Sequence, residues 1–318
     1  MEPRHDTVLL SEAIDSLMVK PTDTVVDATI GGAGHFKLFM ETLGPKGTLI
    51  GIDADHAAIE RAQESLKTIE EKNRPIVALV EDNFRNLTSI LASSGAVTPN
   101  KVLFDLGWSG FQLSTGRGFS FRADEPLLMT YGEPSEAEAT AADLVNHLSE
   151  TSLADMIFAL GEERFARGIA RSIIAVREEK PITTTFELVS AIEAGVPGWY
   201  RHRRLHPATK TFQALRIAVN DELGALRGGL SSALTALAPN GRVAIITFHS
   251  IEDRIVKAML RDAAYAGQGT LVSKKPIVPS SEELARNPRA RSAKLRVFER
   301  GTTSNAAFST STLTSAYA

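Results

Sequence analysis

Several short apolar runs in the first third of the chain each lead to an acidic residue, and this pattern could build a binding edge. Runs rich in Val, Ile and Leu predict buried strands. Open α/β sheets bind ligands beyond the carboxyl ends of their parallel strands. We therefore expect the following carboxyl groups to converge there, although any one of them could merely cap a turn: Asp27, Asp53, Asp82 and Asp105.

A glycine cluster follows the first run, with Gly31, Gly32 and Gly34 ahead of a helical pattern. Glycine permits a positive φ and a close approach of backbone to ligand, and the amides at a helix start face such a ligand. The dinucleotide fingerprint G-x-G-x-x-G would need a glycine where Phe36 or Lys37 stands. A dehydrogenase is therefore disfavoured. S-adenosylmethionine (SAM), a nucleoside without a pyrophosphate, fits better than a tight turn with no ligand.

The segment Asp105-Leu106-Gly107-Trp108 could act on an amino group. It has the acid first and the aromatic fourth, as in the Asp/Asn/Ser-Pro-Pro-aromatic segment of amino-group methyltransferases, but lacks the prolines. Hydrogen bonds from an exocyclic amine to a carboxylate and a backbone carbonyl raise the electron density on its nitrogen. An aromatic face can stack on a flipped base. Trp108 could instead pack beneath a later part of the chain.

The aromatic residues Phe84 and His249 follow two further predicted strands, and each could have either a functional or a purely structural role. Phe84 lies where an aromatic would cover an adenine ring, or it is simply core. His249 could contact substrate, relay a proton, or cap the helix that follows. His202 and His206 are four residues apart, but Pro207 follows them and no third ligand is evident, so we expect no metal site.

The elements that must position these residues follow from apolar periodicity and from turn residues. Strands are expected at 24–27, 48–52, a buried 76–80, 101–105, 242–248, 270–272 and 295–298. Helices are expected at 7–17, 36–43, 57–71, 136–148, 153–159, 162–178, 186–194, 208–223, 224–237 and 251–263. The α/β alternation stops near residue 109, and only helices and loops are expected before the strand at 242.

We therefore predict an α/β fold with a Rossmann-like seven-stranded sheet and an inserted helical domain. The predicted parts are 1–130 and 207–302 for the methyltransferase domain, 131–206 for the helical insertion that recognises substrate, and 303–318 for a flexible tail.

Composition bounds the partners. The 318 residues are 43% hydrophobic and 23% charged, with no cysteine, which excludes disulfides and thiolate metal sites and suits a cytoplasmic location. No apolar run is long enough to span a membrane. The net charge is −3, yet the stretches 201–216 and 286–300 are rich in Lys and Arg, which favours phosphate contacts over a merely solvated surface. A homodimer stays open.

Together these segments resemble the bacterial 16S ribosomal RNA cytosine-N4 methyltransferase family (ribosomal RNA small subunit methyltransferase H). The resemblance runs from about residue 5 to 300. The segments that carry it include Gly31-Gly32-Ala33-Gly34-His35, Asp105-Leu106-Gly107, Arg117-Gly118-Phe119-Ser120-Phe121, Gly161-Glu162-Glu163-Arg164-Phe165-Ala166, His206-Pro207-Ala208-Thr209-Lys210-Thr211-Phe212-Gln213-Ala214-Leu215-Arg216, Phe248-His249-Ser250 and Asn287-Pro288-Arg289-Ala290-Arg291-Ser292.

The resemblance implies the class I SAM-dependent methyltransferase fold, with the helical domain inserted after the fourth strand. It also implies SAM-dependent methylation of N4 of a cytidine in the decoding region of 16S rRNA, on the assembled small ribosomal subunit. The cofactor contacts that it implies are Ala33, Gly34, His35, Asp53, Phe84, Asp105 and Gln112. Our candidate catalytic residues are Asp105, Trp108 and His249. Our candidate RNA contacts are Arg117, Arg203, Arg204, His206, Lys210, Arg216, Arg289 and Arg291.

The chain departs from the family pattern in one loop. The family's Pro-Leu-Asp-Met-Arg-Met-Asp appears here at 126–132 without either acid and without the arginine, and Trp108 replaces a small residue. Two alternatives remain. One is a catalytically weak or inactive RNA-binding ribosome assembly factor that keeps the fold, and the other is a methyltransferase of DNA or of a protein side chain. As a hypothesis, Trp108 and Phe111 supply compensating stacking.

Overall fold

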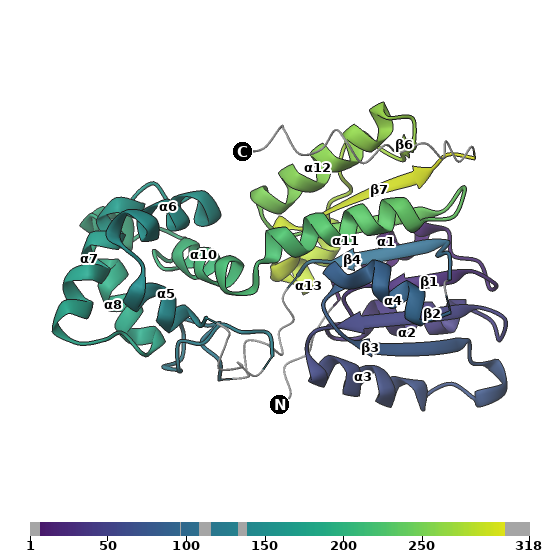
Figure 1. The fold of residues 1–318 in the computed structure, drawn as a ribbon, viewed down its shortest axis with the longest axis horizontal. Helices are drawn as coiled ribbons and strands as arrows, with labels where there is room; N and C mark the ends of the chain where they lie inside the picture. The colour runs from purple at the N-terminus through teal and green to yellow at the C-terminus, as the bar shows by residue number, and fades with distance from the viewer. Residues whose placement is uncertain (1–6, 96, 108–115, 133–138, 303–318) are drawn as a thin grey trace.

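The computed structural model describes residues 7–95, 97–107, 116–132 and 139–302. Its sheet has seven strands in the order β3-β2-β1-β4-β5-β7-β6 (Figure 1). Strands β1 to β5 pair in parallel, and β7 is antiparallel to both of its neighbours. The strands are β1 (Thr24–Asp27), β2 (Thr48–Asp53), β3 (Ile76–Glu81), β4 (Lys101–Asp105), β5 (Arg242–Thr247), β6 (Gly269–Leu271) and β7 (Lys294–Arg300). The predicted Rossmann-like seven-stranded sheet of class I methyltransferases is confirmed.

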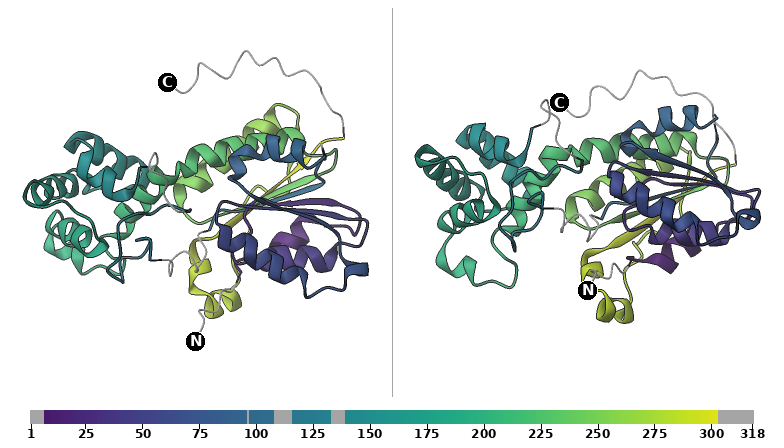
Figure 2. Two further views of the ribbon diagram at one scale, coloured as in Figure 1. Left: turned by 60° about the horizontal axis from the view of Figure 1, so that its bottom comes forward. Right: turned by 90° about the horizontal axis from the view of Figure 1, so that it is seen from below.

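Helices cover both faces of this sheet (Figure 2). One face packs against α1 (Leu10–Leu17), α2 (Gly34–Thr42) and α3 (His56–Leu66) through an apolar cluster that includes Phe36 and Phe39. The other face packs against α4 (Leu87–Ser93), α11 (Glu222–Ala236) and α12 (Ser250–Tyr265) through a second cluster. Strand order reverses direction between β1 and β4, and such a switch point is where open α/β sheets open a crevice for ligands.

A second, helical body lies beside the sheet (Figure 1). It contains α5 (Ala141–His147), α6 (Glu150–Gly161), α7 (Ala166–Glu179), α8 (Thr185–Ala194), α9 (Gly198–Arg201) and α10 (Thr209–Asn220). Capping boxes stabilise the N-termini of α5 and α8. The Thr140 and Thr184 hydroxyl oxygens accept from the amide of the third helical residue, and the carboxylate of that residue accepts from the threonine amide. The apolar core of this body runs from Phe119 to Leu215 and so takes in residues on both sides of the predicted limits. The division at 131 and 206 itself stays a prediction.

Some predicted elements differ from the structure. Strand β3 is partly exposed rather than buried because it forms the edge of the sheet. Glu162 adopts a left-handed conformation that ends α6, so residues 162–165 do not begin α7 as predicted. The helix predicted to reach residue 71 ends at Leu66. Short helices α9 and α13 (Ser281–Arg286), and the 3₁₀ helix 288–292, were not predicted because each is too short for periodicity to show.

Among the described helices, none is both long and apolar enough to cross a bilayer. The predicted flexible tail at 303–318 lies outside the described residues.

Candidate active site

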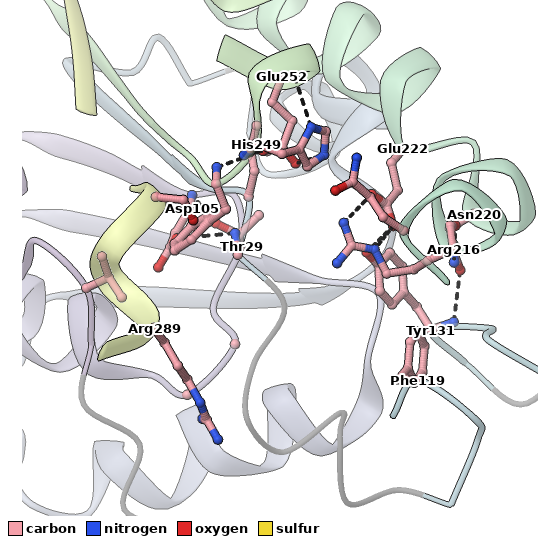
Figure 3. Close-up of a pocket in the computed structure, with 18 of the residues that line it drawn as sticks. Thr29, Asp105, Phe119, Tyr131, Arg216, Asn220, Glu222, His249, Glu252 and Arg289 are labelled. Carbon is pink, nitrogen blue, oxygen red and sulfur yellow. Dashed lines mark hydrogen bonds and ion pairs between the residues drawn. The ribbon is translucent and has the colours of Figure 1, made fainter. Parts of the chain in front are cut away.

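A cavity of about 750 Å³ opens at the carboxyl edge of the sheet, where β1 and β4 diverge in strand order. Residues from the β1–α2 corner, from the ends of β2, β4 and β5, and from the helical body line it. Figure 3 shows Thr29 and Asp105 on one side and Tyr131, Arg216 and Glu222 on the other, with His249 and Glu252 between them. The cavity therefore has a sheet wall and a wall contributed by the helical body.

The turn between β1 and α2, here called the glycine corner (residues 28–34), lines the cavity on the side of the sheet. Gly31 has φ 50° and Ala33 has φ 61°, both in the left-handed region, so the chain turns sharply before α2 begins at Gly34. A Cβ on Gly34 would overlap the Thr7 side chain, which also lines the cavity. Ala33 is buried and shapes the turn, whereas Gly34 and His35 reach the cavity.

Asp53 lies at the end of β2 and holds this corner in place. Its Oδ2 accepts a hydrogen bond of 2.8 Å from the Gly31 amide, and its Oδ1 accepts one of 2.9 Å from the Asp55 amide. Burial raises the pKa of Asp53 to about 6, although these amides and the nearby Arg61 oppose the rise. The carboxyl group lines the cavity, as predicted for a cofactor contact, and its binding role stays a prediction.

Asp105 lies at the end of β4, opposite the helical body. Its amide donates to Thr29 Oγ1 at 2.6 Å, and its carboxylate lies 3.5 Å from His35 Nδ1. The Gly107 amide is 3.4 Å from Asp105 Oδ1. Burial is the largest influence and raises the pKa of Asp105 to about 7; the Gly107 amide opposes this, and the Glu252 carboxylate adds to it. A carboxyl group poised near neutrality suits proton transfer.

Two of the four strand-end acids do not line the cavity, although Asp27 lies close enough to Asp53 and Asp105 for their charges to add to the rise that burial causes in its pKa. Asp27 is fully buried beneath the corner, accepts a 3.2 Å hydrogen bond from the Thr29 amide, and does not line the cavity. Burial raises its pKa well above the usual range. Asp82 accepts hydrogen bonds from the Asn83 amide and from Asn86 Nδ2, and it therefore stabilises the turn after β3. Only Asp53 and Asp105 reach the cavity.

Phe84 satisfies both interpretations that the sequence left open. Its ring lines the cavity and also makes an edge contact with Phe104 at a centroid distance of 5.5 Å. A Cβ on Gly229 of α11 would lie 2.6 Å from the Phe84 ring, so that glycine makes room for it. Trp108 and Gln112, predicted for catalysis and cofactor binding, lie outside the described residues, as does Phe111.

The opposite wall contains a buried polar network that sequence reasoning missed. Arg216 donates to both carboxylate oxygens of Glu222, at 2.7 and 3.0 Å, and the Tyr131 hydroxyl donates to Glu222 at 2.7 Å. Asn220 joins the Tyr131 amide to the end of α10. Burial and the Glu222 charge raise the pKa of Tyr131 well above its usual range. The only available signal was that Asn220 and Glu222 directly follow the long matching segment 206–216.

His249 is the N-cap residue directly before α12, and it lines the cavity. Its Nδ1 accepts from the Glu252 amide at 3.4 Å, so the hydrogen of a neutral ring resides on Nε2. Nε2 lies 3.1 Å from Glu252 Oε1 without the alignment of a hydrogen bond. His249 therefore caps the helix and also lines the cavity, as its two interpretations proposed.

Glu222, His249 and Glu252 offer ligand atoms within 4.8 Å of one another, a grouping that could hold a metal ion and that the sequence did not indicate. Two of these groups already have partners. Glu222 is paired with Arg216, and Glu252 Oε2 accepts from the Phe248 and His249 amides. The absence of a metal site stays a prediction.

The predicted RNA contacts fall into two groups. The first group is buried or engaged: Arg117 donates to the Tyr131 carbonyl, Arg216 pairs with Glu222, Lys210 donates to the Glu162 carbonyl, and His206 stacks on Phe121 at 4.5 Å. The second group is exposed and comprises Arg203, Arg204, Arg289 and Arg291, of which Arg289 lines the cavity.

Comparisons with known proteins place these observations in a family. A model described as the MraW methylase family matches residues 2–301. Three relatives are each named ribosomal RNA small subunit methyltransferase H. The protein of Lachnospira eligens is 43% identical over 316 residues, covering 94% of this chain and 98% of its own. That of Brevibacillus brevis is 44% identical, covering 93% and 98%, and that of Deinococcus radiodurans is 46% identical, covering 93% and 89%.

Proposed function

This chain belongs to the MraW methylase family, and on that premise we propose that it methylates N4 of a cytidine in the decoding region of 16S rRNA, acting on the small ribosomal subunit. The observation that carries the proposal is the partly buried Asp105 carboxyl group, which lies at the end of β4 and lines the cavity of about 750 Å³. The names of the relatives support an rRNA substrate, and the choice of cytidine N4 rests on the resemblance of the 105–107 segment.

SAM is the methyl donor, and it supplies an electrophilic methyl group on a sulfonium sulfur. The residues of the sheet wall suit such a ligand. The cavity volume lies within the roughly 300–1,000 Å³ typical of cofactor sites. Asp53, fixed by two backbone amides, would accept hydrogen bonds from ribose hydroxyls, and the Phe84 ring would cover an adenine.

Asp105 would act on the amine. In its carboxylate form it would accept an N–H hydrogen bond from the cytosine amino group and so raise electron density on the nitrogen. It would also take the proton that the nitrogen must lose. His249 is less suited to that task because its Nδ1 already accepts the Glu252 amide, which leaves Nε2 as a donor. Because Nε2 is itself buried beside Glu252, we assign His249 the role of holding the start of α12 at the cavity.

Orientation of the base would depend on the helical wall. Tyr131 stacks on Phe119 at a centroid distance of 5.9 Å, and both rings line the cavity. Tyr131 belongs to the 126–132 loop, which departs from the family pattern, and there it stands in place of the family's second methionine and supplies aromatic surface to the cavity. Exposed Arg203, Arg204 and Arg291 would contact phosphates outside the cavity.

Transfer of labelled methyl groups from SAM to purified small ribosomal subunits that lack the modification tests this function. We expect label on cytidine N4, with more transfer to subunits than to protein-free 16S RNA. The Asp105→Ala variant should transfer little. No transfer by the wild type, with SAM still bound, would contradict the proposal and favour the assembly-factor alternative.

Gly34→Ala is expected to weaken SAM binding roughly 5- to 150-fold, because overpacking a close contact typically costs about 1–3 kcal/mol. The new Cβ would lie 2.8 Å from Thr7 Cβ and would displace a residue that lines the cavity. Isothermal titration measures the affinity. The double variant Thr7→Gly/Gly34→Ala should recover most of it. Gly228→Ala, whose nearest neighbour is 3.8 Å away, is the matched control and should bind SAM like the wild type.

A further inference from the structure

An exposed tryptophan stands among arginines on the helical body, outside the cavity. Trp199 belongs to α9 and is 57% exposed. It makes edge contacts with Phe165 at 6.0 Å and with Tyr200 at 5.8 Å between ring centroids. None of these three rings lines the cavity, and the function proposed above gives them no role. A large aromatic ring that is held by neighbouring rings and still exposed to water is unusual, and such exposed apolar surface often marks a binding site.

Two arginines lie against these rings. Arg164 Cζ is 4.9 Å from the Trp199 ring centroid and 4.8 Å from that of Phe165, and Arg203 Cζ is 5.4 Å from that of Tyr200. Both guanidinium groups are on exposed residues, and no carboxylate of the described residues forms an ion pair with either. A guanidinium stacked on a ring keeps its N–H edges available for anions.

The acid closest in sequence does not neutralise this surface. Glu163 is fully buried, where it accepts a 2.6 Å hydrogen bond from the Tyr200 hydroxyl and a 2.9 Å bond from the Phe165 amide. Glu163 therefore fixes the two supporting rings from beneath. The outer side presents Trp199 with Arg164 and Arg203, and the exposed Arg201 and Arg204 flank it in the chain.

We propose that this surface, made of Arg164, Trp199 and Arg203, binds an unpaired nucleotide of the rRNA substrate at a second point outside the cavity. The inference rests on the proposed function. A base would stack on the open face of Trp199, and the guanidinium groups would contact the adjoining phosphates. Exposed aromatic rings interleaved with arginine, and without acids, suit single-stranded RNA better than an apolar protein surface.

The chain links this surface to the cavity. Phe121 lines the cavity, and His206 stacks on Phe121 with an interplanar angle of 12°. Residues 201–205, all exposed, connect His206 to α9. A strand of RNA with one nucleotide in the cavity could therefore follow exposed cationic residues to Trp199. Such a contact would anchor substrate without touching the reacting atoms, so it should affect binding and KM rather than kcat.

The test compares Trp199→Ala, Trp199→Phe and the wild type in binding to unmethylated small ribosomal subunits. Alanine in place of a stacking ring typically weakens single-stranded binding roughly 5- to 150-fold. We expect a loss in this range for Trp199→Ala, a rise in KM with kcat within twofold, and partial recovery with phenylalanine. SAM affinity and melting temperature should not change. Tyr265→Ala, which removes an aromatic residue 84% exposed at the end of α12, is the matched control.

A photoreactive phenylalanine analogue at position 199 identifies the occupant. We expect a crosslink to 16S rRNA. Crosslinks to a ribosomal protein alone, or to a second copy of this chain, would overturn the RNA assignment, as would subunit binding by Trp199→Ala equal to that of the wild type. Because the wild type is assayed for methyl transfer in parallel, failure of the proposed function appears as no transfer by any variant. Failure of this inference appears as transfer by Trp199→Ala with the KM of the wild type.

Discussion

Asp105→Ala is expected to lower kcat for methyl transfer about 10²- to 10⁴-fold while leaving the fold intact. The carboxylate would act only as the amine nitrogen develops positive charge and loses its proton, and a positioned acceptor of that kind contributes this much to a rate. Single-turnover transfer to small subunits, with SAM bound beforehand, measures the chemical step. Asp53→Ala is the informative comparison, because loss at that position should appear in SAM affinity instead. Equal turnover by Asp105→Ala and the wild type would remove Asp105 from the mechanism.

The pH profile provides a second measure of the same residue. Burial raises the pKa of Asp105 to about 7, and the active form is the carboxylate. The value of kcat/KM should therefore fall as the pH drops through about 7 and level off above it, since this ratio reports groups of the free enzyme. Asp105→Asn keeps the volume and a carbonyl acceptor for the Gly107 amide but cannot ionise. Its small residual activity should lack this inflection.

The melting temperature of an inactive Asp105 variant shows whether the substitution removed a catalytic group or disrupted the fold. The folded pKa of Asp105, about 7, lies above its usual value of 3.8, so the folded state binds the proton more tightly. Stability then decreases as pH rises from about 4 to about 7, and the ionised group opposes folding above that range. Asp105→Asn should consequently melt no lower than the wild type at pH 8, and its relative gain should disappear near pH 4. A lower melting temperature at pH 8 would mean that the inactive variant is misfolded.

The sheet wall was largely predictable from the sequence. Parallel strands align their carboxyl ends, so acids that end consecutive apolar runs must lie near one edge, and Asp53 and Asp105 do. The same rule brings Asp27 close to Asp53 and Asp105, but it does not reveal that Asp27 and Asp82 stay out of the cavity lining. Whether a side chain reaches the cavity depends on how far it lies from the end of the strand and on the conformation of the following turn. An apolar run in the sequence reveals neither. Asp27 is fully buried beneath the glycine corner, and the Asp82 carboxylate accepts a hydrogen bond within the turn after β3.

The helical wall could not be predicted in the same way. Tyr131 and Glu222 are 91 residues apart, and they meet only because the helical body folds back on α10 and α11. Arg216 illustrates the limit. Within a basic stretch it suggests a solvated phosphate contact, yet its place on α10 puts it on the buried side with Phe212 and Leu215. Charge in a sequence predicts the sign of a surface, but helix packing decides which cation is on it.

Glu222→Ala is expected to lower the free energy of unfolding by about 3–5 kcal/mol, the usual effect of removing one partner from a buried ion pair. The side chains of Arg216 and Glu222 are only 11% and 12% exposed. Burial lowers the pKa of Arg216, but the Glu222 charge more than offsets this, so the guanidinium stays charged and would lose its carboxylate in the variant. Thermal and urea denaturation followed by circular dichroism measure the change.

Two control variants distinguish the contribution of the Arg216–Glu222 ion pair from that of the Tyr131 hydrogen bond. Tyr131→Phe removes one hydrogen bond to the charged Glu222 carboxylate and should cost only about 1.5–3 kcal/mol. The double variant Arg216→Met/Glu222→Leu replaces both charges with apolar groups of similar length, so it should recover most of the stability that Glu222→Ala loses. If the losses at 216 and 222 simply added, the two charges would not be coupled. Because Arg216 lies on α10 and Glu222 begins α11, recovery would show that the two charges stabilise the junction of these helices only as a pair.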